Sequence, residues 1–167
     1  MKKFLFLLII NSFQLAAQEK NYFYQIKEFD KNYSQNAIIS RFLHSVGFRY
    51  YWATEGLREK DLEYKPSETG INSRETLEHI YGLSIIIKNG LNNKSIIRSK
   101  SYPNLSFAEL REKTLNNLKS GIDKVNSYKD SDFIDNKIIF GDMKFDLYNL
   151  FHGPISDALY HTGQIVV

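Results

Sequence analysis

Hydrophobic residues recur at steps of three and four along four stretches of the chain, which is the period of an amphipathic helix. The first stretch runs from about Ser34, a suitable N-cap, to Gly56. Its apolar positions are Ile38, Ile39, Phe42, Val46, Tyr50, Ala53 and Leu57. The polar stretch 57–70 follows and contains Pro66 and Gly70, so we expect it to form a connection.

Two further helices carry a start signal as well as an apolar stripe. Asn72 and Glu75 have the spacing of a capping box, and so do Ser106 and Glu109. The stripe of the second helix consists of Leu77, Ile80, Leu83, Ile87 and Leu91. The third helix carries Leu110, Thr114, Leu118, Ile122 and Val125, a seven-residue rhythm suited to packing between helices.

The last part of the chain predicts a loop and then a fourth helix. Residues 128–146 are polar with a brief apolar alternation, so we expect a loop with a short hairpin around Gly141. Pro154 suits the first turn of the final helix, whereas the apolar residues before it favour a start near Phe145 and a bend at Pro154. Four helices with little strand signal predict an all-α fold over residues 34–167, in the form of an antiparallel four-helix bundle.

The first 17 residues have the layout of a secretory signal peptide. Lys2 and Lys3 precede the apolar run 4–10, which is too short to span a bilayer, since that takes about 20 residues. A retained anchor or a buried helix is the alternative. We expect cleavage after Ala17, an N-terminal extension over 18–33, and an exported protein, periplasmic or extracellular, without a stable membrane anchor.

Removal of this leader would change the length and the net charge of the chain. It would leave 150 residues, enough for one domain, and would lower the formal net charge from +3 to +1 because two lysines are lost. No dense cluster of lysine and arginine is present, so we expect no nucleic-acid partner. Because the sequence has no cysteine, stability has to come from a packed core rather than from disulfides.

Asp157 and His161 stand four residues apart in GPISDALYHTGQ, so they share one face of the final helix. Such a pair can hold one metal ion if a third ligand comes from a neighbouring helix. His79, in LEHIYGL of the second helix, is the candidate, and we expect it to point inward with Leu83 and Ile86. The alternative is a core histidine bonded to a backbone carbonyl.

Three segments together resemble the DinB superfamily of four-helix-bundle proteins, namely RYYWATEGLREKDLEYKP, the helix containing LEHI, and GPISDALYHTGQI. The resemblance extends from about residue 36 to the end, and its most specific parts are the second-helix histidine and the HxGQ motif at 161–164. It implies a divalent transition metal held by His79, Asp157 and His161, with zinc or nickel favoured over iron or manganese. The family often has histidine where this chain has Asp157, which leaves the identity of the metal open.

Three polar residues are further candidates at such a site. His152 is a rival ligand, although nine residues before His161 put it on the opposite side of an ideal helix unless Pro154 bends the chain. Glu55 could act as a general base if it faced the metal, with a solvated carboxylate as the alternative. Gln164 follows His161 by three residues and could orient it or a bound water, or else lie on the surface.

Three ring residues are less specific candidates. Trp52 and Tyr160 could line the pocket, but packing in the core is the more common role for large aromatics in a bundle. His44 has no positional support as a ligand, and we expect it to be structural or exposed.

The resemblance implies a metal-dependent enzyme that acts on a small molecule. Relatives include thiol-dependent S-transferases and isomerases, but low-molecular-weight thiols are chiefly cytosolic, so the expected export favours hydrolysis of a small ester or amide. The alternative is a bundle that binds a metal or a small molecule without turnover. Family members often pair, so a homodimer is an expectation on the same basis.

Overall fold

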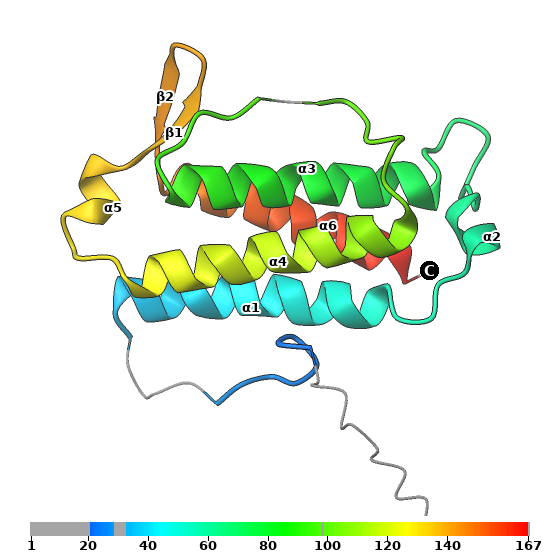
Figure 1. Ribbon diagram of the computed structural model, residues 1–167, viewed down its shortest axis with the longest axis horizontal. Helices are drawn as coiled ribbons and strands as arrows, with labels where there is room; N and C mark the ends of the chain where they lie inside the picture. The colour runs from blue at the N-terminus through cyan, green and yellow to red at the C-terminus, as the bar shows by residue number, and fades with distance from the viewer. Residues whose placement is uncertain (1–20, 29–32, 98, 167) are drawn as a thin grey trace, which may run out of the picture.

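The computed structural model describes residues 21–28, 33–97 and 99–166, so the expected signal peptide and its cleavage site lie outside the described residues. Over these ranges the fold is all-α apart from one small hairpin (Figure 1). The main helices are α1 (Gln35–Ala53), α3 (Ser73–Leu91), α4 (Phe107–Asn126) and α6 (Ser156–Ile165). Shorter elements are α2 (Glu59–Leu62), α5 (Asp132–Asp135), β1 (Lys137–Phe140), β2 (Met143–Asp146) and the π-helical η1 (Phe151–Ile155). No helix within these ranges is long and apolar enough to cross a membrane.

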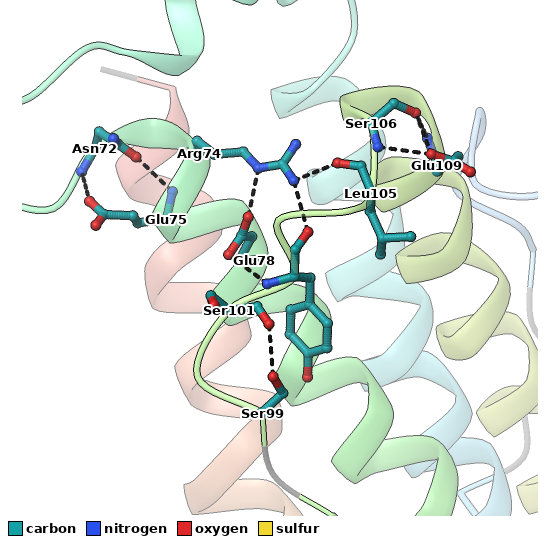
Figure 2. Close-up of polar contacts among 10 residues, drawn as sticks. Asn72, Arg74, Glu75, Glu78, Ser99, Ser101, Leu105, Ser106 and Glu109 are labelled. Atoms are coloured by element: carbon teal, nitrogen blue, oxygen red, sulfur yellow. Dashed lines mark hydrogen bonds and ion pairs between the residues drawn. The ribbon is translucent and has the colours of Figure 1, made fainter.

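Side-chain caps begin α1, α3 and α4 where the sequence predicts. Ser34 accepts a backbone N–H from the first turn of α1. Asn72 with Glu75, and Ser106 with Glu109, form reciprocal capping boxes in which each partner binds the other's backbone N–H (Figure 2). Each cap is worth about 1 kcal/mol, and together they fix where the helices start and hence which faces become buried.

The four main helices lie side by side, with α1 and α3 each packed against both α4 and α6 (Figure 1). Helices α3 and α4 run in the same direction. Arg74 near the start of α3 donates to the carbonyl of Leu105 just before α4, and the Tyr128 hydroxyl after α4 donates to the carbonyl of Leu91 at the end of α3. Helices α1 and α6 run in the opposite direction. The expectation of antiparallel packing is therefore wrong for the α3–α4 pair.

The connection over residues 92–106 makes this parallel pair feasible. Helix α3 has 19 residues and is about 28 Å long, whereas a connection of this length can span up to about 50 Å when extended. The described residues of this connection, 92–97 and 99–106, return along α3 to the end where α3 began (Figure 1). The connection is tied to the hairpin on the way, because the backbone N–H of Ile96 donates to the carbonyl of Ile139 at 2.8 Å.

The predicted stripes of α3 and α4 are confirmed, since all ten of their residues are buried. The buried face of α1 is rotated from its predicted position. Ile38 and Phe42 are exposed, and small or polar residues such as Ser40 and Gly47 are buried instead. Ser40 is satisfied there by Asn126 of α4, whose side-chain oxygen accepts its hydroxyl at 2.5 Å. A count of apolar residues cannot detect such a face.

Residues 21–28 of the expected N-terminal extension pack on α1. The ring of Phe23 is buried against Gly47, and the rings of Tyr22 and Phe23 lie beside that of His44. His44 is therefore a buried structural residue. Burial, followed by the charge of Lys27, lowers the pKa of its imidazole. This aromatic cluster fixes the start of the described chain to the outer face of α1.

The hairpin around Gly141 is confirmed, with Gly141 in the left-handed conformation (φ +58°) that a two-residue hairpin turn requires. The final helix is bent, as one of the two alternatives predicts. Gly153 departs from helical angles (φ −95°, ψ −115°) and Pro154 lies inside the helical run. The expected start near Phe145 is wrong, because that residue belongs to β2 and pairs with Ile138.

Gly47 should not tolerate a side chain. A Cβ at this position would overlap the buried ring of Phe23, so we expect Gly47→Ala to lower the free energy of unfolding by about 1–3 kcal/mol through overpacking. The matched control is Gly163→Ala in α6, where a Cβ meets nothing within 4 Å. The higher helix propensity of alanine should raise the free energy of unfolding of this variant by roughly 0.5–1 kcal/mol. Urea unfolding of both variants measures the difference, and equal stabilities would contradict the packing of Phe23 on α1.

Candidate metal centre

Helices α3 and α6 bring three ligating side chains together. His79 lies in the second turn of α3, and Asp157 and His161 lie one turn apart on α6. His79 Nε2 is 3.1 Å from Asp157 Oδ2, and His161 Nε2 is 3.2 Å from Asp157 Oδ1. One ligating atom from each of the three residues lies within 4.8 Å of the other two. The structure therefore brings together the three residues that the sequence selects as ligands.

The expectation that His79 points inward is wrong. Its side chain is 45% exposed, whereas Leu83 and Ile86 on the same helix are buried. The imidazole extends to the outer edge of the contact between α3 and α6, where the side chain of Asp157 is 42% exposed and that of His161 is 17% exposed. The three residues are thus held by the fold but remain accessible to solvent and to a small molecule.

Gln164 fixes the orientation of His161. The amide oxygen of Gln164 lies 2.6 Å from His161 Nδ1, and because an amide oxygen can only accept, Nδ1 carries the proton. In a neutral ring Nε2 then presents its lone pair to Asp157 Oδ1 at 3.2 Å. Two acceptors at that distance repel each other unless a proton or a cation lies between them.

The donor set fits a divalent cation. Two imidazole nitrogens and one carboxylate form a mixed nitrogen and oxygen set that transition metals accept, and three protein ligands leave further positions open. A histidine ligand usually donates its second ring N–H to an oxygen acceptor, which is the arrangement of His161 and Gln164. The cluster could therefore hold a metal ion.

The other polar candidates do not join this group. His152 lies in η1, exposed and beside the ring of Tyr148 (centroids 6.2 Å apart), because the bend at Gly153 does not bring it to the ligand face of α6. Glu55 follows α1 and forms an ion pair with Arg111 of α4. Neither belongs to the set of converging ligating atoms within the described chain.

The expectation of core packing for Trp52 and Tyr160 is wrong, since both are exposed. The indole N–H of Trp52 donates to the carbonyl of Tyr24 at 3.1 Å, which binds the N-terminal segment to α1. The ring of Tyr160 lies edge-on to that of His161, with centroids 5.2 Å apart. Tyr160 is thus the one of the two that contacts a candidate metal-binding residue, His161.

A pocket of about 510 Å³ lies beside the three residues, and we call it the loop pocket. It is bounded by α3, by Asp157 of α6 and by residues 96, 97, 99, 100 and 102 of the connection between α3 and α4. His79 and Asp157 form part of its wall. A ligand in this volume would therefore contact two of the three ligating residues.

Arg74 and Glu78 hold the outer wall of the loop pocket in place, and sequence reasoning missed them. Arg74 Nε donates to Glu78 Oε1 at 2.7 Å, and its terminal nitrogen donates to the carbonyls of Tyr102 and Leu105 (Figure 2). The backbone N–H of Tyr102 donates to Glu78 Oε2 at 2.9 Å. The four-residue spacing of Arg74 and Glu78 is visible in the sequence, but their partners on the loop are not.

Comparison with known proteins adds no relative to this picture. A scan against protein-family models, a search of curated proteins and a search of solved structures each found no match.

Removal of one ligand should abolish tight metal binding. We expect His79→Ala to weaken zinc binding by more than about 100-fold, since losing a group that merely supports a ligand already costs about 10- to 100-fold. His152→Ala is the matched control, because it removes an exposed histidine outside the group. Calorimetric titration of the metal-free proteins with zinc measures both, and equal affinities would contradict the site.

Gln164 should act through His161. We expect Gln164→Leu to weaken zinc binding by about 10-fold, because Nδ1 of His161 loses its acceptor. Gln164→Glu keeps an acceptor oxygen and should retain the affinity of the native protein. The same titration distinguishes the two variants, and an unchanged affinity in Gln164→Leu would show that the bond does not support a ligand.

Proposed function

We propose that this chain is an exported DinB-type protein that binds one divalent transition metal through His79, Asp157 and His161 and hydrolyses a small ester or amide. The observation that carries the proposal is the convergence of these three side chains on the wall of a pocket of small-molecule size. The side-by-side packing of α1, α3, α4 and α6 supports the four-helix bundle that this proposal includes. Zinc or nickel suits the ligand set best.

The protein's own residues have separate tasks in this proposal. His79, Asp157 and His161 hold the ion, and Gln164 keeps Nε2 of His161 directed at it. When bound, such an ion supplies Lewis-acid chemistry, polarising a carbonyl or acidifying a ligand. The loop pocket orients the substrate beside His79 and Asp157, and the apolar side chains in its wall exclude part of the solvent.

Hydrolysis is preferred over thiol transfer because of the leader. Residues 1–17 have the layout of a signal peptide, and a protein carried out of the cytosol leaves the compartment where low-molecular-weight thiols are abundant. Water, which accepts the acyl group in hydrolysis, is available in every compartment. The exposure of His79 and Asp157, close to half for each side chain, supports access by water and by a small ester.

The test is metal-dependent turnover by the purified protein. We expect the zinc-loaded protein to hydrolyse p-nitrophenyl acetate above the rate of free zinc, and Asp157→Ala to lose this activity because a ligand is missing. His152→Ala should retain it. A parallel assay of thiol conjugation to an electrophile distinguishes transfer from hydrolysis. Stoichiometric zinc binding with no turnover in either assay would contradict the enzymatic function and indicate a helical bundle that binds a metal without catalysis.

A further inference from the structure

The loop pocket is apolar over most of its wall and polar at two places. Its volume of about 510 Å³ lies within the ~300–1,000 Å³ typical of small-molecule sites. Leucine and isoleucine side chains of α3 and of the loop form the apolar part, and they are Leu83, Ile85, Ile86, Ile96 and Ile97. The polar places are the ligating side chains of His79 and Asp157, and a cluster on the loop that includes Lys100.

Lys100 is a cation in this wall that has no side-chain partner among the described residues. Glu78, the other charged side chain there besides the ligating pair, is buried and bonded to Arg74 and to the backbone N–H of Tyr102. Lys100 makes no hydrogen bond or ion pair with any residue in the described part of the chain. Its ammonium is therefore available to an anionic group that enters from solvent.

Gly82 leaves the part of the loop pocket beside His79 open. It lies three residues after His79 on the same face of α3, and it lines the pocket without a side chain. A Cβ there would meet the Tyr102 hydroxyl at 3.6 Å, an ordinary contact, so an alanine fits but a longer side chain would extend into the pocket. Because Arg74 and Glu78 hold Tyr102 (Figure 2), this volume exists before a ligand binds.

We propose that the loop pocket binds a small molecule with a short apolar body and a carboxylate end, the carboxylate on Lys100 and the reacting group beside His79 and Asp157. A single ammonium matches the single charge of a carboxylate. The leucine and isoleucine side chains in the same wall match an aliphatic body. This assignment rests on the proposed metal-dependent function, and it narrows the substrate to an ester or amide of an aliphatic acid that carries a second acid group.

Hydroxamates of graded length test the assignment, because a hydroxamate binds divalent metals and leaves the other end free. The probes are succinic, glutaric, adipic and pimelic monohydroxamates, each compared with the methyl-ended hydroxamate of the same length. Zinc-loaded protein is titrated with each by calorimetry. At the best length we expect the carboxyl-ended probe to bind about tenfold more tightly, the gain of one charge-assisted bond.

Two pairs of variants locate the effect. Lys100→Met should remove the tenfold preference and leave the methyl-ended affinity unchanged, whereas Lys94→Met, on the same connection but outside the pocket wall, should change neither. Gly82→Leu should weaken all the hydroxamates by more than tenfold while zinc binding is kept, and Gly82→Ala should keep both.

The outcomes separate this inference from the proposed function. If zinc does not bind, both are overturned. If zinc binds but the two kinds of hydroxamate have equal affinities, or Lys100→Met keeps the preference, the carboxylate assignment is wrong and the metal site stands. If Gly82→Leu leaves hydroxamate affinity unchanged, the ligand does not occupy the loop pocket and the inference is overturned.

Discussion

Helix α6 packs against α3 so that the carboxylate of Asp157 lies between two imidazole nitrogens, one from each helix. Asp157 is close in sequence to one of its two partners, His161, and far in sequence from the other, His79. The α6 pair follows from the helical repeat alone, but His79 is 78 residues away from Asp157 and reaches it only through the packing of the core. Any change that separates the two helices removes the site without touching a ligand.

Two features of the backbone make this contact usable. The bend at Gly153 and Pro154 sets the direction of α6 after the hairpin, and the long connection after α3 returns along that helix and forms the outer wall of the loop pocket. The Arg74–Glu78 pair then fixes the far end of the connection. A shorter connection would have placed α4 antiparallel to α3 and left the ligands without a pocket beside them.

Local signals in the sequence predict where helices begin, but they do not predict features of the fold that depend on tertiary packing. The capping boxes at Asn72 and Ser106 locate two helices because each is complete within four residues. The buried face of α1 could not be predicted, since the space for Phe23 is made by a glycine, a residue that no hydrophobic pattern counts. The parallel direction of α4 could not be predicted either, because the length of the connection between α3 and α4 permits both directions. Of the candidate site, the grouping of His79, Asp157 and His161 could be predicted from spacing and from the DinB resemblance, but the exposure of His79 and the loop contacts of Glu78 depend on tertiary structure.

We propose that one cation, rather than two protons, holds Asp157 between His79 and His161. Diffraction from crystals grown with zinc, recorded on both sides of the zinc absorption edge, distinguishes the two arrangements. We expect one anomalous peak bonded to Nε2 of each histidine and to the Asp157 carboxylate at about 2.0–2.2 Å. An absent peak, or one that lies away from these three residues while the rings hydrogen-bond directly to the carboxylate, would contradict it.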